Sequence, residues 1–370
     1  MGIFRCFGCN EGGDVFKFLQ KTQGIGFTEA VRELAQAAGV EVPERRLTPD
    51  ERHKIAKRAS LLDVCDMAGA WFHSQLLTST EGKAARDYLE GRGFSMDTIK
   101  VARLGYAPDG WQGLLNHLHG QGVSPQQAVA AGLARQKEGT GRSYDLFRGR
   151  LIIPIRDGRG RVVAFGGRVL EGIGPPDAPK YVNSPETEIY QKSKILYGLS
   201  AARSSITSRG RLLIVEGYFD VLALHQAGFT EAVATCGTAL TADHMRIIRP
   251  LTRRVVVLFD GDEAGMRAAE KSLGMMLKAG IEPQRLDLGE SKDPDEFIQA
   301  QGGEAFTALL ERAEPLFELV LRRISARHGA TPVGKEQTLA DLAPLLRAYD
   351  GAARMAAIAR VASALGLNEA

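Results

Sequence analysis

The sequence predicts a mixed α/β protein, in which a parallel sheet covered by helices lies next to an α+β subdomain and a C-terminal helical bundle follows. Three patterns support this prediction. Between residues 210 and about 300, short apolar runs alternate with helix patterns, which is typical of a parallel sheet. Before them, residues 52–205 place helices first and then short strands. After residue 303 the pattern is helical to the end.

The composition is that of a folded protein kept in a reducing compartment. The chain has 370 residues, 47 Lys and Arg, 44 Asp and Glu, and a formal net charge of +3, with 44% hydrophobic residues. These values exclude the disordered, collagenous and coiled-coil classes. No apolar run approaches the ~20 residues that a transmembrane helix needs, and the chain has only four cysteines. We therefore expect a cytoplasmic protein without a membrane segment.

Shifts in composition divide the sequence into five predicted segments. The first is a small domain that ends near a proline, and a short polar linker follows it. A helix-then-strand segment, the parallel α/β segment and a helical segment complete the chain. The predicted boundaries, in order, are 1–43, 44–51, 52–208, 209–300 and 301–370.

The third segment contains one long helix pattern and one hairpin pattern. The turn 157–160 (Asp-Gly-Arg-Gly) separates the apolar run 151–155 from the run 161–165, which predicts two antiparallel strands. Earlier in the segment, apolar residues recur every three or four positions and predict an amphipathic helix. These residues are Leu61, Cys65, Ala68, Phe72 and Leu76.

Two cysteines near the start have the spacing of a metal-binding knuckle. Cys6 and Cys9 are separated by two residues, and two thiolates at this spacing supply half of a tetrahedral zinc site. A structural zinc site needs four ligands, and no Cys or His precedes Cys6 in the sequence. The pattern leaves two alternatives open, a partial zinc ribbon or two thiols in a loop.

The stretch from Arg142 to Arg168 carries an excess of positive charge. It contains seven arginines against two aspartates. A guanidinium group matches phosphate oxygens, so this stretch favours a nucleic-acid or nucleotide partner over a solvated basic surface. The run 180–185 (Lys-Tyr-Val-Asn-Ser-Pro) adds an ammonium group, an aromatic ring and an amide. The predicted contact residues are Arg148, Arg150, Arg156, Arg161, Arg168, Lys180 and Asn183.

Acidic residues follow two predicted strands of the parallel sheet. Glu216 ends one apolar run, and Asp260 and Asp262 follow another. Ligands of parallel α/β sheets bind outside the carboxyl ends of the strands, so we expect these carboxylates to meet at one edge. Further acidic candidates are Asp220, Asp293 and Asp295.

Several carboxylates at one edge require a counter-charge. Two of them ~4 Å apart repel each other by about 4 kcal/mol at an effective dielectric of about 20. Divalent cations relieve this repulsion, and Mg²⁺ takes oxygen ligands while it keeps waters for substrate phosphates. Two such metals can hold the attacking and leaving oxygens of a phosphoryl displacement. A lone Asp-Gly-Asp is usually a turn, but its occurrence together with Glu216 favours a metal site.

Two of these runs resemble the TOPRIM domain, namely Val215–Asp220 (Val-Glu-Gly-Tyr-Phe-Asp) and Phe259–Gly265 (Phe-Asp-Gly-Asp-Glu-Ala-Gly). The start around Cys6 resembles the second half of the zinc ribbon of bacterial replicative primases of the DnaG family. Other runs resemble the same family: Pro154–Asp157, Ala164–Arg168, Lys180–Thr187, Leu196–Leu199, Thr241–His244 and Lys292–Asp295. The resemblance covers most of residues 4–300. It implies a Rossmann-like TOPRIM sheet next to a primase-specific α+β subdomain.

The resemblance also implies an activity. Members of this family are DNA-directed RNA polymerases that make short RNA primers on single-stranded DNA by two-metal nucleotidyl transfer. The family's catalytic ligands for Mg²⁺ or Mn²⁺ correspond here to Glu216, Asp260 and Asp262. Further acidic positions of that cluster correspond to Asp220, Asp293 and Asp295. A basic ridge for template and nucleotide phosphates corresponds to Arg168, Lys180 and Asn183.

The partners implied by the resemblance follow from this activity. We expect a monomer in the bacterial cytoplasm, at the replisome, that binds single-stranded DNA, ribonucleoside triphosphates and the primer RNA–DNA hybrid. The replicative helicase and the single-strand-binding protein are the expected protein partners, although residues 331–370 supply only the beginning of a helicase-binding region. Zn²⁺ is expected only if further N-terminal ligands complete the set, because Cys6 and Cys9 cannot close a site alone.

Two alternative functions remain compatible with these motifs. One is a TOPRIM nuclease; a type IA topoisomerase is disfavoured, because no stretch of the chain has room for the large domain that carries its nucleophilic tyrosine. The other is a non-catalytic fragment that binds single-stranded DNA. Metal-dependent incorporation of ribonucleotides distinguishes a primase from both.

Overall fold

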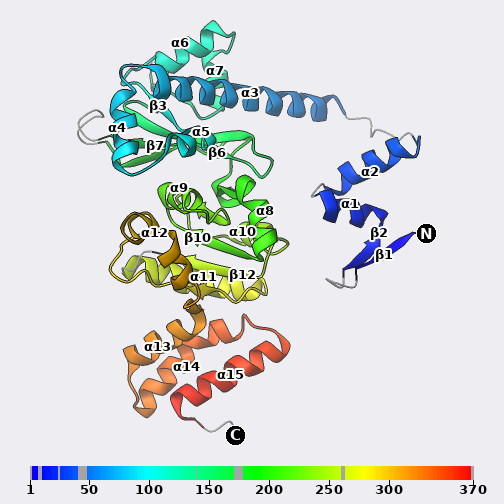
Figure 1. Ribbon diagram of the computed structural model, residues 1–370, viewed down its shortest axis with the longest axis vertical. Coiled ribbons are helices and arrows are strands. Elements are labelled where there is room, and N and C mark those ends of the chain that lie inside the picture. The colour runs from blue at the N-terminus through cyan, green and yellow to red at the C-terminus, as the bar shows by residue number, and fades with distance from the viewer. Residues whose placement is uncertain are drawn as a thin grey trace. The chain divides into compact units, whose positions relative to one another are not determined.

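The computed structural model describes residues 2–6, 11–23, 26–40, 48–139, 141–170, 178–259 and 263–367 (Figure 1). These residues belong to two compact units, Met1–Ala56 and Lys57–Ala370. Within the described ranges, no helix is both long and apolar enough to cross a membrane.

The small unit is a hairpin followed by two helices. Its strands pair antiparallel, with Ile3 opposite Asp14. The rings of Phe4 and Phe18 pack edge to face, 5.2 Å apart, and join the hairpin to the first helix. Ala30 is the fully buried apolar residue of this unit's described part, so its core is very small. The elements are β1 (Ile3–Arg5), β2 (Gly12–Asp14), α1 (Val15–Gln23) and α2 (Phe27–Ala37).

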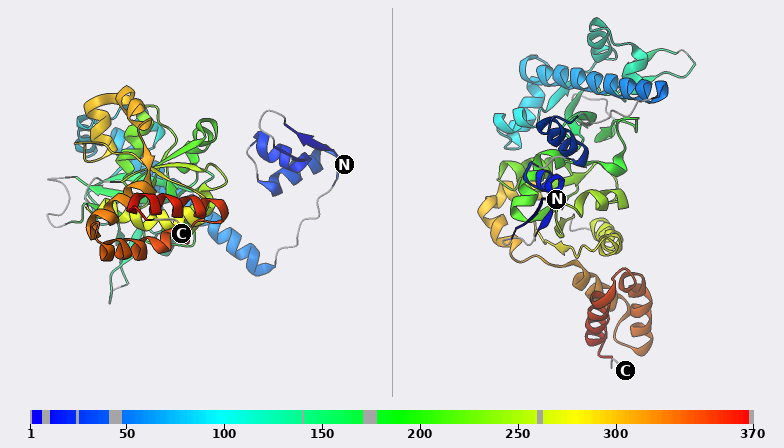
Figure 2. Two further views of the ribbon diagram at one scale, coloured as in Figure 1. Left: turned by 90° about the horizontal axis from the view of Figure 1, so that it is seen from below. Right: turned by 90° about the vertical axis from the view of Figure 1, so that its right-hand side faces the viewer.

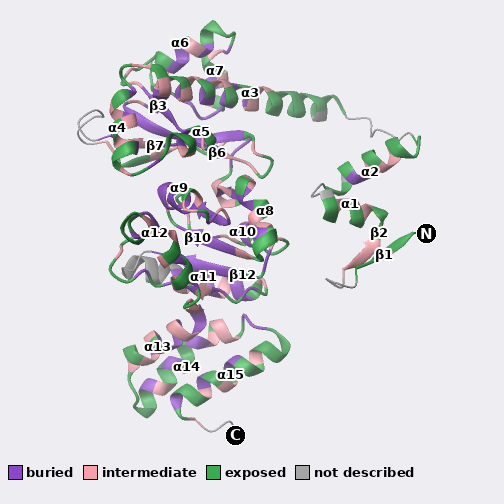
Figure 3. Cartoon of the chain, in the orientation of Figure 1, coloured by how far each residue is buried: buried purple, intermediate pink, exposed green. Residues whose placement is uncertain are grey.

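The long helix α3 (Pro49–Thr78) begins in the small unit and continues into the large one. Its first turns are exposed, whereas its second half is buried along one face (Figure 3). The Phe72 ring packs edge to face on Phe165, with 5.5 Å between the ring centroids. The predicted amphipathic helix is confirmed here, since each of its predicted apolar residues is buried: Leu61, Cys65, Ala68, Phe72 and Leu76.

The first part of the large unit is an antiparallel sheet covered by α3 and shorter helices. The sheet has four strands in the order β3-β6-β7-β8, so β8 forms one of its edges. A separate two-stranded ribbon pairs β4 with β5. The helices are α4 (Lys83–Gly91), α5 (Met96–Val101), α6 (Gly113–Gly120) and α7 (Pro125–Ala130). The strands are β3 (Gly105–Ala107), β4 (Ala134–Gln136), β5 (Ser143–Asp145), β6 (Arg150–Arg156), β7 (Val162–Val169) and β8 (Tyr181–Asn183).

The predicted hairpin is confirmed in the pairing of β6 with β7. Asp157 forms its turn, because its Oδ1 accepts hydrogen bonds from the backbone N–H groups of Arg159 (2.9 Å) and Arg161 (3.0 Å). Gly160 completes the turn with a φ of 82°, a left-handed conformation that favours glycine.

The second part of the large unit is a six-stranded sheet in the order β14-β13-β12-β10-β11-β9. Its four inner strands are parallel and its two edge strands run antiparallel to their neighbours. The strands are β9 (Leu196–Tyr197), β10 (Arg211–Val215), β11 (Ala232–Thr235), β12 (Arg254–Leu258), β13 (Gln284–Arg285) and β14 (Glu314–Pro315). The other elements are η1 (Lys192–Lys194), α8 (Leu199–Arg209), α9 (Tyr218–Gln226), α10 (Ala242–Ile248), α11 (Glu263–Lys278) and α12 (Pro294–Leu310).

Helices cover both faces of this sheet, and alternate strand residues belong to different cores. Leu213 and Val215 pack in one core with residues of α9, α12 and the antiparallel sheet. Leu212 and Ile214 pack in a second core with residues of α8, α10 and α11. Because residues 212–215 of β10 are buried on both faces, they form a continuous apolar run rather than an alternating pattern.

Three helices follow the sheet and form a C-terminal bundle (Figure 2). They are α13 (Leu316–His328), α14 (Pro332–Leu346) and α15 (Gly351–Leu365). Phe317, Leu342 and Val361 are buried in the second core of the six-stranded sheet, so the bundle shares that core. Thr331 caps α14, as its hydroxyl accepts a hydrogen bond from the N–H of Gly334 (3.1 Å).

Candidate active site

The candidate site lies at the carboxyl ends of the parallel strands. Glu216 follows the last residue of β10, and Thr235 is the last residue of the neighbouring β11. On its other side β10 pairs with β12 in parallel, with Val215 opposite Leu258. The predicted ligands Asp260 and Asp262 lie outside the described residues.

A cavity of about 650 Å³ opens at this edge, and both parts of the large unit line it. The antiparallel part contributes cations, aromatic rings and an amide, whereas the parallel part contributes carboxylates and a glycine-containing turn. From the antiparallel part come Tyr88, Arg92, Arg168, Lys180, Tyr181 and Asn183. From the parallel part come Glu216, Gly217, Tyr218, Phe219, Asp220, Thr235, Gly237 and Asp293.

Three of the predicted acidic residues line the cavity, and two of them also cap helices. Asp220 Oδ2 accepts a hydrogen bond from the N–H of Gly217 (2.9 Å) at the start of α9. Asp293 Oδ1 accepts one from the N–H of Glu296 (2.8 Å) at the start of α12. Helix amino termini favour carboxylates, so these bonds hold both side chains in place. Glu216 is the third.

The donor set of this cavity fits a hard divalent cation, because carboxylate oxygens are the ligands that such cations prefer. Within the described ranges, however, no group of three Asp, Glu, His or Cys residues is close enough to enclose a metal ion. Asp295 does not line the cavity. It is fully buried, it forms an ion pair with Arg92, and its Oδ1 accepts a hydrogen bond from Gln299 Nε2 (2.7 Å).

Two guanidinium groups face the cavity and share its aromatic rings. Arg168 lies 5.4 Å from the centroid of Phe219 and 5.2 Å from that of Tyr88, and its Nη1 donates to Tyr181 Oη (2.7 Å). Arg92 lies 4.7 Å from the Phe219 centroid. Cation–π contacts of this kind hold a guanidinium group in a fixed plane while leaving its charge available. In the described part of the chain, Arg168 forms no ion pair with a carboxylate.

Asn183 joins the two parts of the large unit at the cavity wall. Its Oδ1 accepts a hydrogen bond from Tyr218 Oη (2.9 Å), and its Nδ2 donates to the carbonyl oxygen of Cys236 (3.2 Å). Both ends of the amide are therefore bonded to the parallel part. A methyl group at Gly166 would lie 2.8 Å from the Tyr218 ring, so glycine permits this close approach.

The other predicted arginines lie away from this cavity. Arg148 stacks on Trp111 at 3.8 Å, and Arg150 is buried with its Nη1 donating to the carbonyl oxygens of Gly167 (3.1 Å) and Pro179 (2.9 Å). Both line a second cavity of about 440 Å³, together with Arg135, Tyr144 and Val182. Burial lowers the pKa of Arg150, and the nearby Arg148 charge lowers it further.

Two arginines of the same stretch are held by the hairpin itself. Arg156 Nη1 donates to the carbonyl oxygen of Gly160 (2.9 Å), and Arg161 pairs with Asp157 (2.7 Å). Arg156 lines a separate cavity of about 350 Å³, beside α5 and α9. The seven predicted contact residues therefore do not form one surface. Three of them, Arg168, Lys180 and Asn183, line the 650 Å³ cavity, and the other four lie elsewhere.

Sequence reasoning missed Tyr88 and Arg92 as residues of this site. They belong to the end of α4, more than 120 positions before Glu216, and no local pattern connects them to the acidic runs. The one local sign in the sequence is that Arg92 lies between two glycines, which indicates the end of a helix but not a binding site. At the other end of the chain, Cys6 is exposed, and Cys9 lies outside the described residues.

Comparisons with known proteins agree with this arrangement. Residues 71–203 match the family model for the N-terminal domain of the DNA primase catalytic core, residues 213–298 that for a Toprim-like domain, and residues 1–49 that for a CHC2 zinc finger. A DNA primase of Streptomyces coelicolor is 38% identical over 99% of this chain. A DNA primase of Halalkalibacterium halodurans is 41% identical over 82% of this chain. The chain spans 58% of the length of the first relative and 50% of the length of the second.

Solved structures give the same result. A DnaG primase catalytic domain bound to single-stranded DNA superimposes with a TM-score of 0.77 and 36% identity, over 85% of this chain and 98% of that domain. The zinc-binding and RNA polymerase domains of the Aquifex aeolicus primase give a TM-score of 0.72 and 31% identity over 99% of this chain and 85% of that one. This chain therefore belongs to the DnaG family of bacterial DNA primases.

Proposed function

We propose that this chain is the catalytic part of a DNA primase, a DNA-directed RNA polymerase that makes short RNA primers on single-stranded DNA. One observation carries the proposal. A single cavity has carboxylates on one wall, Glu216 and Asp220, and cations on the other, Arg168 and Lys180. Nucleotidyl transfer on a nucleic acid requires this combination, because charge develops on phosphate oxygens that both walls must stabilise.

The carboxylate wall is the proposed site of two divalent cations, Mg²⁺ or Mn²⁺. Glu216, with Asp260 and Asp262, forms the proposed ligand set, and Asp220 and Asp293 support it from the two helix starts. Cations held there would stabilise the attacking 3′ oxygen and the departing pyrophosphate. The residues themselves keep the oxygen donors on a rigid frame, because Asp220 and Asp293 are each fixed by a backbone N–H group.

The cationic wall is the proposed site of substrate phosphates. Arg168 presents a guanidinium group that stacks on aromatic rings, and Lys180 adds a mobile ammonium group. The second cavity lies on the opposite side of β8, where Arg148 is the proposed further contact for the template strand, and Arg150, which was predicted for the same role, is buried in the cavity wall. A relative with 36% identity is described as bound to single-stranded DNA, which supports this assignment.

Further partners follow from membership of the family. We propose that Zn²⁺ binds Cys6 and Cys9 only when other ligands complete its coordination. The replicative helicase and the single-strand-binding protein are the proposed protein partners, and ribonucleoside triphosphates are the proposed substrates. We propose that the protein works as a monomer in the cytoplasm at the replisome.

The deciding experiment is incorporation of labelled ribonucleotides on single-stranded DNA with Mg²⁺ or Mn²⁺. Synthesis should require the template and should be lost in Glu216→Gln and Asp260→Ala. Glu311→Gln, which changes an exposed carboxylate at the end of α12, is the matched control and should retain full activity. Cleavage of the template without incorporation would instead identify a nuclease. Salt-sensitive DNA binding without either reaction would identify a non-catalytic fragment.

A further inference from the structure

The two aspartates of the Asp293–Asp295 motif occupy different environments. Asp293 lines the 650 Å³ cavity and caps α12, so its carboxylate is at the proposed metal site. Asp295 is fully buried in the first turn of the same helix and does not line the cavity. A divalent cation that keeps waters for its substrate needs a ligand that faces solvent. The position of Asp295 therefore points to another role.

The carboxylate of Asp295 is occupied by two side-chain donors. Its Oδ2 pairs with Arg92 Nη2, and its Oδ1 accepts a hydrogen bond from Gln299 Nε2 (2.7 Å). The Asp295 side chain is 1% exposed and that of Arg92 is 26% exposed. The ion pair thus has a buried end at Asp295 and an open end at Arg92, which lines the cavity. Buried charges persist only when they are paired in this way.

Arg92 is held in one plane by three neighbours. Asp295 accepts from Nη2, Tyr88 Oη accepts from Nη1 (2.8 Å), and the guanidinium group lies 4.7 Å from the centroid of Phe219. The Phe219 ring also carries Arg168, at 5.4 Å. The guanidinium groups of Arg92 and Arg168 consequently face the same cavity and share the Phe219 ring. The distance between them depends on how Asp295 holds Arg92.

The backbone around Arg92 is anchored independently of Asp295. Gln226 of α9 accepts a hydrogen bond from the N–H of Ser95 (2.8 Å) and donates one to the carbonyl oxygen of Gly93 (2.8 Å). Loss of the Asp295 carboxylate would therefore release the Arg92 side chain while the loop that carries it stays in place. This separation makes the role of Asp295 testable.

We infer that Asp295 is a positioning residue that holds Arg92 against Phe219, so that the guanidinium group of Arg92 binds a substrate phosphate. The inference rests on the proposed function of the cavity and assigns Asp295 no place among the metal ligands. The phosphate belongs either to a nucleoside triphosphate or to the template backbone, since a planar guanidinium fork fits both.

The test compares Asp295→Asn with Asp293→Asn, two equal changes within one motif. Mn²⁺ titration followed by electron paramagnetic resonance measures metal affinity. Separate titrations with ATP and with a fluorescent oligothymidylate distinguish the two phosphate sources. We expect Asp295→Asn to keep its Mn²⁺ affinity within about twofold and to bind ATP or the oligonucleotide about tenfold more weakly, as for one lost charge-assisted hydrogen bond. Asp293→Asn should lose Mn²⁺ affinity.

A double-substitution cycle shows whether Asp295 acts through Arg92. Arg92→Ala should weaken the same ligand, and adding Asp295→Asn to it should cause little further loss. If Asp295→Asn alone does not fold, this double variant replaces it, because it removes the buried ion pair as a whole. The Mn²⁺ and ligand titrations are then made on the double variant against Arg92→Ala.

Two results would overturn the inference. One is an Mn²⁺ affinity that falls as far in Asp295→Asn as in Asp293→Asn. The other is a double variant whose loss of binding free energy equals the sum of the losses in Asp295→Asn and Arg92→Ala. Neither measurement needs turnover, so a chain that binds these ligands but incorporates no ribonucleotide would defeat the proposed function without obscuring this test.

Discussion

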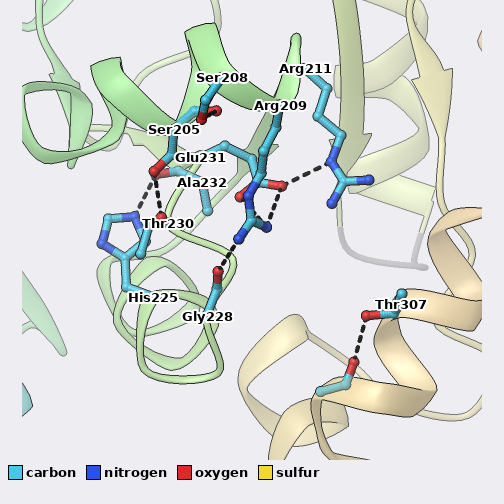
Figure 4. A network of polar contacts seen from close by, with 11 residues as sticks. Ser205, Ser208, Arg209, Arg211, His225, Gly228, Thr230, Glu231, Ala232 and Thr307 are labelled. Atoms are coloured by element: carbon cyan, nitrogen blue, oxygen red, sulfur yellow. Dashed lines mark hydrogen bonds and ion pairs between the residues drawn. The ribbon is translucent and has the colours of Figure 1, made fainter.

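Replacement of Glu231 by alanine should destabilise the large unit by about 3 kcal/mol and leave the proposed primer synthesis unchanged. Glu231 immediately precedes β11, so it lies at the amino-terminal edge of the six-stranded sheet, opposite the edge that carries Glu216. Its carboxylate is fully buried between Arg209 (Nη1–Oε2, 3.0 Å) and Arg211 (Nε–Oε1, 2.8 Å), as Figure 4 shows. Arg209 also donates to the carbonyl oxygen of Gly228 (2.9 Å), so one network joins α8, β10 and the turn before β11.

The magnitude follows from burial. Removal of one partner of a buried ion pair costs about 3–5 kcal/mol, because the remaining charge has lost its counter-charge and its water. Here the Arg209 and Arg211 side chains are 40% and 27% exposed and regain water, so we expect the lower end of that range. Urea unfolding measures the loss. Asp87→Ala, which breaks the exposed pair with Lys83, is the control and should cost less than about 1 kcal/mol.

Two outcomes would refute this reasoning. If Glu231→Ala loses no more stability than Asp87→Ala, burial does not determine the strength of the network. If synthesis falls while the unfolding midpoint is unchanged, the network acts on the opposite edge of the sheet. Glu231→Gln keeps the shape of the side chain and removes its charge. Its free energy of unfolding should lie between those of the wild type and Glu231→Ala.

Three further perturbations test other parts of the structure. Burial raises the pKa of Asp145 from 3.8 to about 6, so the folded state holds this proton more tightly and stability should decrease by about 3 kcal/mol as pH rises from about 4 to about 6. Asp145→Asn should remove that slope in urea unfolding measured across this range. A methyl group at Gly105 would lie 2.6 Å from Phe72 Cβ, so Gly105→Ala should cost about 1–3 kcal/mol. A methyl group at Gly91 would meet no atom within 4 Å, so Gly91→Ala should not destabilise the protein. Thermal unfolding of the two variants compares these effects. Arg168→Gln should reduce the salt dependence of single-stranded DNA binding by about one phosphate contact, whereas an unchanged slope would exclude Arg168 from the template surface.

Much of the architecture could be predicted because its signals are local. The apolar run at 212–215, the glutamate after it and the helix that begins at Tyr218 follow one another within a few residues, and β10 and α9 form there. The helix pattern from Leu61 to Leu76 is repeated often enough to define a face. In contrast, β9 and β14 have only two residues each, too few for any periodic pattern. Their places at the sheet edges depend on pairing with distant strands.

The site could be predicted only where its residues follow strands. Glu216 is expected at the carboxyl end of β10 because strand direction alone determines that position. Arg92 and Asp295 are 203 positions apart, and their ion pair joins the residue that ends α4 to the first turn of α12. The arginine-rich stretch shows the same limit. Its composition predicts a basic surface, but hydrogen bonds to carbonyl oxygens and to Asp157 decide which of its guanidinium groups face a cavity.

The edge strand β8 explains why one basic stretch serves two cavities. Successive residues of a strand point to opposite faces, so Tyr181 and Asn183 line the cavity that contains Glu216, while Val182 lines the cavity of Arg148 and Arg150. Asn183 in turn is bonded to Tyr218 and Cys236 of the parallel part, which ties β8 to the carboxylate edge. A strand of three residues therefore contributes side chains to both of the proposed phosphate surfaces. Under the proposed function, a template strand that crosses β8 would contact both surfaces, whereas a single nucleotide would contact one.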